Sequence, residues 1–382
     1  NLRTHRVAGT ALCSYGEGEW DDTLEPAQAS MKKDMASTWT IALLYQATRA
    51  LSERLPHDGD APAQRLADAF GQEAETIHTA FARDFIFDGV LAGYVSFRDG
   101  MPMPLIHPDD RHTGIRYRLI PMTRSIIAGL LDAAGERRHE SIIDEHLHYP
   151  DGVRLMSQPA AFHDGVTTVF KRAEQAANIG REIGLMYTHA HIRYSEALGL
   201  LGRETLGREL LRISPVGQFA RLATSEPRQR NCYFASSDAD FPDRTTAAAQ
   251  WDRLRDGAAD PVGVRGGWRV YSSGPGIYLR QMMQHLFGIQ LHTDRVVFDP
   301  VLEAGDDGTV IDVALFGTMR HIRYCVVDGA VPVEVSVGGR SVAGDRVALP
   351  YRQGGISVSA ALLGDAEDLT VTVGTARVAA TK

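Results

Sequence analysis

The sequence has few cysteines and no long hydrophobic run. Its 382 residues include three cysteines, Cys13, Cys232 and Cys325, which lie far apart. They form neither a metal-ligand spacing nor a disulfide framework, which is typical of a reducing compartment and predicts a cytoplasmic location. No stretch of about 18 apolar residues is present, so no membrane-spanning helix is expected. No signal peptide is visible, but the chain opens with Asn1 instead of methionine, so this decides little about export.

The sequence also lacks any excess of positive charge. It has 40 Lys and Arg against 48 Asp and Glu, which gives a formal net charge of -8. An acidic balance argues against nucleic acid or an anionic membrane as the main partner. The length exceeds that of one ordinary compact core, unless the fold is a large barrel or toroid.

The chain up to about residue 295 is expected to be mainly helical. Residues 31–55 carry apolar side chains at steps of three and four, including Met35, Trp39, Leu43 and Ala47, which is typical of a helix with one buried face. Similar patterns predict helices near 61–83, 122–135, 168–201, 204–213, 244–256 and 276–288. Long loops rich in Gly, Pro and Asp lie between them, such as 96–114, and loops of that length are often functional.

From about residue 296 the pattern changes to short β-branched runs, namely VVFDPVL, TVIDVALFG, HIRYCVVDG, PVEVSVGG and DLTVTVG. Their period-two alternation and their Gly and Asp breaks predict an antiparallel β-sandwich. The expected architecture is therefore mainly α with a C-terminal all-β domain, divided into residues 1–295 and 296–382. Paired helices of similar length suit a helical toroid, in which loops at one end build a site.

An acidic segment near the start, GEGEWDDTLEP (residues 16–26), packs five carboxylates around Trp20. The simple interpretation is a solvated loop. The functional interpretation is a sugar-cleaving site, because an aromatic ring can stack on a sugar. A carboxyl near other carboxylates also has a raised pKa and can keep a proton to donate.

Two further stretches could contact an anion. Ser272, Ser273 and Gly274 run into a proline that begins an apolar-periodic helix, which fits either plain helix capping or phosphate binding at a helix start. His189 and His191 lie two apart on an expected helix, so they point to different faces and do not chelate one metal together. Each histidine is either a packed, hydrogen-bonded residue or a contact to an anionic ligand.

A third stretch, NCYFASSDADFPDR (residues 231–244), contains Asp238, Asp240 and Asp243. A calcium loop of the EF-hand type is excluded, because its sixth position is Asp243 instead of Gly and its twelfth is Ala249 instead of Glu. The stretch is either a polar loop with local turns or a loop that lines a sugar site.

Several blocks carry a resemblance to a known family. EWDDTLEPA followed by MASTWTIALLYQATRAL resembles the catalytic segment of glycoside hydrolase family 94, the inverting disaccharide and oligosaccharide phosphorylases. GREIGLMYTHAHIRYSEAL, NCYFASSDADFPDR and YSSGPGIYLRQMMQHLFGI resemble later blocks of that family in the same order. The segments WDDTL and YRLIPMTRSI most resemble those of the 1,2-β-oligoglucan phosphorylases within this family. The resemblance implies an (α/α)6 barrel, here lacking its N-terminal part, followed by a C-terminal β-sandwich.

The resemblance also implies roles for single residues. Asp22, the second Asp after Trp20, matches the general acid of the family. The sequence departs from the family at Ser157, where relatives usually have Asp, and the family's phosphate-contacting arginine and its neighbouring sugar-binding residues are expected upstream of Asn1. The other matches are substrate contacts at Trp20, Asp21, Tyr187 and Asp238, and phosphate contacts at His189, Ser272, Ser273 and Gly274.

These matches imply the inverting phosphorolysis of β-1,2-linked glucooligosaccharides to α-glucose 1-phosphate. Asp22 would protonate the glycosidic oxygen and inorganic phosphate would attack, so neither a base carboxylate nor a metal or organic cofactor is needed. The alternatives are a β-glucan hydrolase on the same fold, with Asp238 or Asp240 as base, and an inactive or truncated carbohydrate-binding fragment. Relatives are often dimers, so a homodimer is one option that the composition does not test.

Overall fold

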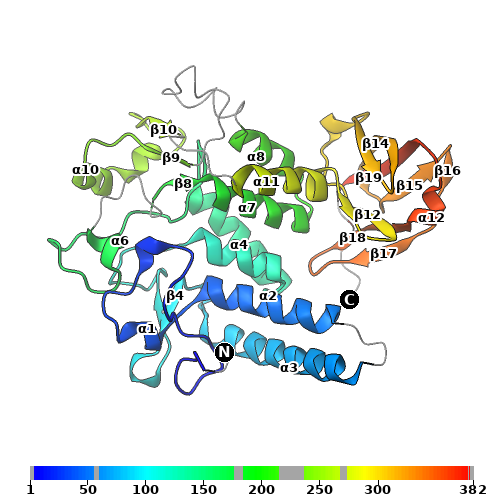
Figure 1. The fold of residues 1–382 in the computed structure, drawn as a ribbon. Helices are drawn as coiled ribbons and strands as arrows, with labels where there is room; N and C mark the ends of the chain where they lie inside the picture. The colour runs from blue at the N-terminus through cyan, green and yellow to red at the C-terminus, as the bar shows by residue number, and fades with distance from the viewer. Residues whose placement is uncertain are drawn as a thin grey trace. The chain divides into compact units, whose positions relative to one another are not determined.

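A computed structural model of the chain describes residues 4–55, 60–175, 184–214, 236–266, 273–376 and 378. These residues form two compact units (Figure 1). The first unit holds the described residues up to His191 and those from Ser236 to 266. The second holds those from Ile192 to 214 and from Ser273 onward.

The two longest helices of the first unit pack against each other. Helices α2 (Thr38–Arg54) and α3 (Ala61–Asp84) pack side by side, and α4 (Leu119–Ala128) packs against α2 (Figure 1). Asp60 caps α3 by accepting a hydrogen bond from the Ala63 N–H at 3.2 Å. The prediction of a helix at 61–83 is therefore confirmed to within one residue.

Shorter helices complete the first unit. The helix predicted at 122–135 is two helices, because Gly129 adopts a left-handed conformation (φ 70°) that ends α4. Asp132 then caps α5 by accepting from the Gly135 N–H. The remaining helices are α1 (Met31–Asp34), α5 (Ala133–Ile142), α6 (Lys171–Gln175), α10 (Arg244–Ala249), the 3-10 helices η1 (Asp22–Leu24), η2 (Arg98–Gly100) and η5 (Trp251–Leu254), and the π-helix η3 (Ile143–Leu147).

Small sheets in the first unit were not predicted. The continuous helix expected at 31–55 is wrong at β1 (Met35–Ser37), which is fully buried and pairs with β4 (Tyr94–Ser96). The helix expected at 168–201 is likewise wrong at β8 (Met186–Tyr187), which pairs with β9 (Ser236–Ala239). The other strands of this unit are β2 (Ile86–Phe87), β3 (Val90–Leu91), β5 (Met103–Leu105), β6 (His148–Tyr149), β7 (Gly152–Val153) and β10 (Val264–Gly266).

Helices of the second unit lead into its sheets. Helix α7 (Thr188–Leu201) begins in the first unit and ends in the second, which also contains α8 (Leu206–Ile213). Helix α11 (Ser273–Gln281) continues as the π-helix η6 (Met282–Leu286), so the helix predicted at 276–288 is largely confirmed. The short helices η7 (Ala304–Asp306) and α12 (Ala360–Leu363) lie among the strands.

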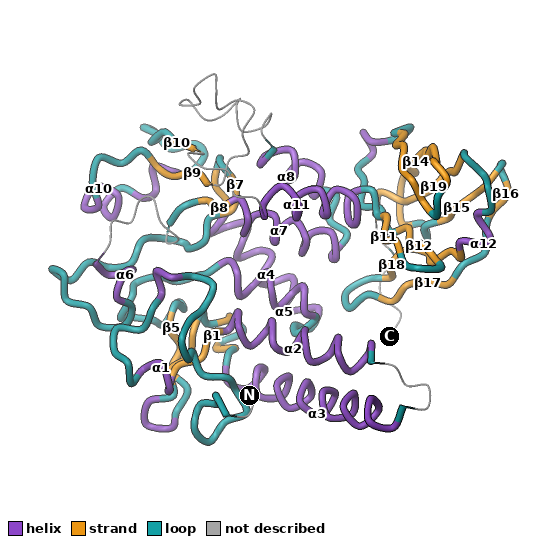
Figure 2. Tube along the Cα trace, in the orientation of Figure 1, coloured by secondary structure: helices purple, strands orange, loops and turns teal. Residues whose placement is uncertain are grey.

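The strand-rich C-terminal region contains two sheets (Figure 2). One has the order β11-β12-β18-β17 and the other β13-β14-β19-β15-β16, and buried residues of both share one hydrophobic core. Each of the five runs predicted as strands contains a strand in the structure, although VVFDPVL leaves its strand after Phe298. The bounds are β11 (Ile289–Leu291), β12 (Arg295–Phe298), β13 (Val310–Leu315), β14 (Thr318–Ala330), β15 (Glu334–Val337), β16 (Arg340–Ser341), β17 (Asp345–Ala348), β18 (Gln353–Ser359) and β19 (Asp368–Ala376).

The expectation of a purely antiparallel sandwich is wrong at one pair. Strands β14 and β19 run parallel, with His321 opposite Asp368 and Val326 opposite Val373. A parallel pair needs a long crossover, and the segment between these strands supplies one, since it contains β15 to β18. The structure therefore has helices with small sheets followed by a strand-rich region. The closure of a helical barrel and the boundary at residue 295 stay predictions.

Candidate active site

The acidic loop at residues 16–26 contains both buried and exposed carboxyls. Asp21 is fully buried and caps η1, because its carboxylate accepts hydrogen bonds from the N–H and the hydroxyl of Thr23. Asp22, the first residue of η1, is exposed. Of these two neighbouring aspartates, Asp21 takes the buried position and Asp22 the exposed one.

A buried ion pair holds this loop. The Arg118 Nη2 lies 3.0 and 2.9 Å from the two carboxylate oxygens of Glu19 and 3.5 Å from Asp21 Oδ2. The side chains of Arg118 and Glu19 are 1% and 0% exposed. Burial lowers the pKa of Arg118, but Glu19 and Asp21 outweigh it and raise the pKa above its ordinary value. The guanidinium therefore stays charged inside the protein.

The same ion pair joins several elements. Glu19 also accepts hydrogen bonds from Ser37 Oγ at 2.9 Å and from the Asp21 N–H at 2.9 Å. The Arg118 guanidinium lies 4.8 Å from the centre of the buried Tyr94 ring. Sequence reasoning missed Arg118, because nothing in YRLIPMTRS distinguishes a buried arginine from an exposed one.

The outer carboxylates of the loop face lysines. Glu25 lies 3.5 Å from both Lys32 and Lys171, and these ammonium groups, Lys171 above all, lower its pKa. Glu17 lies 3.7 Å from Lys32 and is almost fully exposed. These pairs are solvated surface contacts and add little to stability.

Two of the predicted substrate contacts, Trp20 and Tyr187, form one aromatic group with His189, a predicted phosphate contact. The Trp20 ring centre lies 5.5 Å from that of Tyr187 and 6.3 Å from that of His189. Tyr187 and His189 stack at 6.4 Å with 15° between their planes. Strand β8 supplies Tyr187 and the start of α7 supplies His189, so the fold brings both beside the acidic loop. All three rings are partly exposed and can contact a ligand.

Asp238 lies on β9, next to the strand that carries Tyr187. Its Oδ1 lies 3.4 Å from Nη1 of Arg154, a fully buried arginine. Arg154 also donates to Asp151 Oδ2 at 2.8 Å and to the Gly184 carbonyl at 2.6 Å. Asp240 is exposed. A base role for Asp238 would have to operate beside this buried guanidinium.

Two residues singled out from the sequence have structural contacts. His191 is fully buried, and its Nδ1 accepts a hydrogen bond from the Val153 N–H at 3.1 Å, as expected for a packed histidine. Ser157 is also buried, and its Oγ accepts from the backbone N–H groups of Arg116 and Tyr117 at 3.3 and 3.2 Å.

The predicted phosphate loop is described only in part. Ser272 lies outside the described residues, whereas Ser273 begins α11 and Gly274 is buried within its first turn. Both belong to the second unit. Their phosphate contacts stay predictions, as do the roles of Asp22, Trp20, Asp21, Tyr187, Asp238 and His189.

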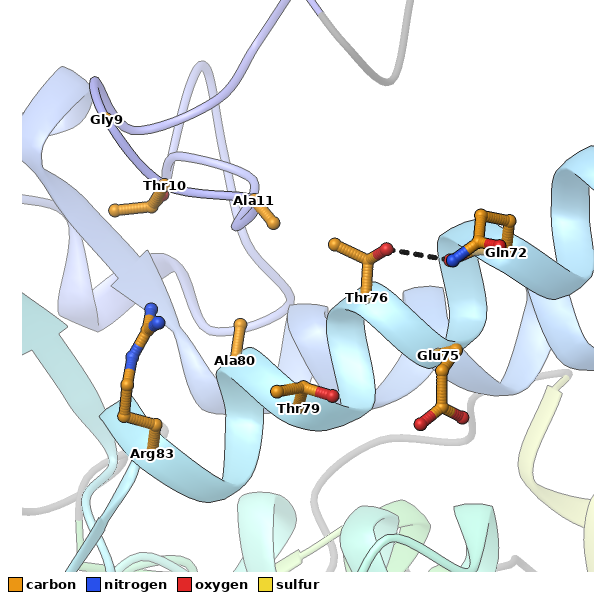
Figure 3. Close-up of a pocket in the computed structure, with 9 residues that line it drawn as sticks. All are labelled: Gly9, Thr10, Ala11, Gln72, Glu75, Thr76, Thr79, Ala80 and Arg83. Atoms are coloured by element: carbon orange, nitrogen blue, oxygen red, sulfur yellow. Dashed lines mark hydrogen bonds between the residues drawn. The ribbon is translucent and has the colours of Figure 1, made fainter.

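A separate pocket of about 380 Å³ lies between the loop at Gly9–Ala11 and one face of α3 (Figure 3). Its lining includes Glu75, Thr79 and Arg83, and Arg83 pairs with Asp84. None of the predicted site residues lines this pocket. In the ranges that the structure describes, no three His, Cys, Asp or Glu side chains gather to hold a metal ion, and no helix is long and apolar enough to cross a membrane.

A carboxylate loop beside exposed aromatic rings is an arrangement that can contact and protonate a sugar. The chain is 45% identical over 311 residues to a 1,2-beta-oligoglucan phosphorylase of Listeria innocua serovar 6a. The match covers 81% of this chain and 28% of that relative, so this chain spans little more than a quarter of the relative's length. No protein-family model matches the chain.

Solved structures with some likeness include a sialidase and a GH78 family rhamnosidase of Bacillus sp. GL1. Each is 14% identical and covers 85% of this chain. The match covers 26% of the sialidase at a TM-score of 0.45, and 28% of the rhamnosidase at 0.43. Nothing about this protein's chemistry follows from likeness at that level.

Proposed function

We propose that the chain is part of an inverting phosphorylase that converts β-1,2-linked glucooligosaccharides and phosphate to α-glucose 1-phosphate and a shortened oligosaccharide. The 45% identity to a 1,2-beta-oligoglucan phosphorylase supports the relationship. The observation that carries the chemistry is the grouping of Trp20 with Tyr187 and His189, directly beside the Asp22 loop.

In this proposal Asp22 is the general acid. Its side chain is exposed at the start of η1, where it can reach a bound ligand, and it would donate a proton to the glycosidic oxygen. Trp20 and Tyr187 would stack on the sugar, and Asp21 and Asp238 would support its hydroxyl contacts. Phosphate is already an anionic nucleophile, so one acid suffices where an inverting hydrolase needs an acid and a base.

The phosphate would lie on the opposite side of the anomeric carbon from the acid. His189, whose ring centre lies 6.3 Å from that of Trp20, is one of its proposed contacts, and Ser272, Ser273 and Gly274 stay the others that the sequence predicts. Free N–H groups at a helix start and the helix dipole favour such an anion. No metal or organic cofactor is part of the proposal.

The wider architecture belongs to the same proposal. Residues 1–295 would be a portion of an (α/α)6 barrel and residues 296–382 the β-sandwich that follows it. Cys13 and Cys325 are not in a disulfide, which suits a cytoplasmic location, while Cys232 lies outside the described residues. A homodimer would agree with the relationship.

The test uses the intact protein that contains this chain. It is incubated with β-1,2-glucooligosaccharide with and without phosphate, and glucose 1-phosphate and free glucose are measured. Asp22→Asn should lose a factor of about 10² to 10⁴ in kcat, the usual contribution of a general acid. Asp34→Asn, an exposed aspartate nearby in sequence, is the matched control and should change kcat by less than about twofold.

Two results would decide against the proposal. Sugar release that proceeds equally well without phosphate would favour the hydrolase alternative, and loss of that activity in Asp238→Asn or Asp240→Asn would identify its base. Full activity of Asp22→Asn would remove the general acid from the scheme.

A further inference from the structure

The general acid of the proposed reaction lies between two anchored neighbours. Asp21 and Thr23 are both fully buried, whereas Asp22 between them is exposed. The Asp21 N–H donates to Glu19, and the Asp21 carboxylate accepts from Thr23. The backbone is therefore fixed on both sides of residue 22, while its side chain is left to contact a ligand.

The anchor of this loop is the carboxylate of Glu19. One of its oxygens accepts from Ser37 Oγ, the other accepts from the Asp21 N–H, and Arg118 Nη2 contacts both. Ser37 is the N-cap of α2, and Arg118 is the residue that precedes α4. The buried Glu19 carboxylate thus holds the acidic loop against the starts of α2 and α4, which are far apart in sequence.

Charge explains why an arginine is needed. Glu19 and Asp21 are two buried carboxylates within 3.5 Å of the same guanidinium group. Without the positive charge, the two would repel each other in a region that excludes water. A lysine would retain the charge as a compact ammonium, but it would lack the planar guanidinium that lies 4.8 Å from the Tyr94 ring centre while its Nη2 contacts both Glu19 oxygens.

Resting on the proposed function, we propose that the Arg118–Glu19 ion pair positions the general acid, holding the backbone at residues 21–23 so that the Asp22 carboxyl meets the glycosidic oxygen. Arg118 and Glu19 are positioning residues and touch no substrate. Because a misplacement of about 1 Å can cost about a hundredfold in rate, a loosened loop should lower kcat more than it raises KM.

The first test compares Arg118→Lys with Arg320→Lys in the intact protein. Arg320 is also 1% exposed, and it donates to the carbonyls of Ala366 and Gly364 in the C-terminal region. With β-1,2-glucooligosaccharide and phosphate, Arg118→Lys should lower kcat about 10- to 100-fold and leave both KM values within about threefold. Arg320→Lys should leave kcat of the folded enzyme within about threefold.

A second readout separates positioning from general damage. In an Asp22→Asn background the acid is already absent, so adding Arg118→Lys should change kcat by less than about threefold. If Arg118→Lys lowered kcat as strongly in the Asp22→Asn background as in the wild type, Arg118 would act through something other than Asp22. That result would overturn the inference.

A milder pair of variants covers the case in which Arg118→Lys does not fold. Ser37→Ala removes one hydrogen bond to Glu19 and one N-cap, whereas Asp60→Ala removes only the N-cap of α3. Ser37→Ala should lower kcat about 3- to 10-fold, and Asp60→Ala should leave it unchanged. Equal kcat values for the two variants would overturn the inference.

The outcomes also separate this inference from the function on which it rests. If the wild-type protein forms no glucose 1-phosphate, the proposed function fails. If the wild type is active and Asp22→Asn is not, but Arg118→Lys behaves like Arg320→Lys, only the positioning role fails.

Discussion

One buried histidine should make the stability of the first unit depend on pH. His139, on α5, is fully buried. Its Nε2 accepts a hydrogen bond from the Leu91 N–H at 3.0 Å, so its Nδ1 carries the proton and donates to the Gly135 carbonyl at 2.7 Å. Burial lowers the pKa of His139 to about 4, so the folded protein holds the neutral ring at ordinary pH.

The direction and the size of the stability change follow from the pKa values of His139 in the folded and unfolded states. An unfolded histidine titrates near 6.5, so between about pH 6.5 and 4 the unfolded state binds a proton that the folded state does not. Stability from this group is therefore present above about pH 6.5 and is lost as the pH falls toward 4. At about 1.4 kcal/mol per pH unit, the total loss is about 3 kcal/mol, of which about 2 kcal/mol is reached by pH 5.

The measurement is the free energy of unfolding by urea at pH 7.5 and pH 5, for the wild type and His139→Gln. The wild type should lose about 2 kcal/mol more than the variant between these pH values. His321→Gln is a control of opposite sign, because the hydrogen bond to Asp312 raises the pKa of His321 and its stabilisation disappears as pH rises. Parallel pH dependences for the wild type and His139→Gln would refute the reasoning.

Two other predictions concern an ion pair and an aromatic ring. Arg352→Met should lower the stability of the second unit by about 3 to 5 kcal/mol, because it leaves Asp299 buried without the guanidinium that contacts both its oxygens at 2.8 Å. Arg295→Met, which loses only an exposed pair, should cost under about 1 kcal/mol, and equal melting temperatures for the two would contradict this difference. Trp20→Ala should raise KM for the oligosaccharide about 10-fold or more with a smaller effect on KM for phosphate, because about 1.5 kcal/mol of ring contact is lost. An unchanged oligosaccharide KM would argue that the ring only packs against Tyr187.

Local signals were sufficient for much of the fold. The apolar spacing predicted helix α3 to within one residue, and its Asp60 cap and early proline agree with that pattern. The C-terminal strands were recognisable because alternating β-branched runs end at Gly and Asp. These features depend on neighbours in sequence, which a single chain displays.

Features set by distant partners were not predictable. Strand β1 interrupts an apolar pattern that favours helix, because Met35–Ser37 pairs with Tyr94–Ser96, some 60 residues away. The parallel pairing of β14 with β19 depends in the same way on a crossover whose path no local pattern encodes.

The candidate site also combines features that the sequence showed with features that depend on distant partners. The acidic loop and its tryptophan were visible in the sequence, as was the histidine at 189. The sequence did not show which of the two carboxyls is buried. Asp21 and Asp22 have identical side chains, and the N-cap role of Asp21 at η1 decides their exposure. Arg118 was missed because its role depends on contact with Glu19, 99 residues earlier in the chain.

The position of β19 has a consequence for how the second unit forms. This strand is the middle member of the five-stranded sheet, between β14 and β15. During synthesis, β13 and β14 can form their hairpin early, but β15 and β16 cannot join them until residues 368–376 have left the ribosome. A nascent chain that stops short of these residues would present the long edge of β14 to any other exposed strand.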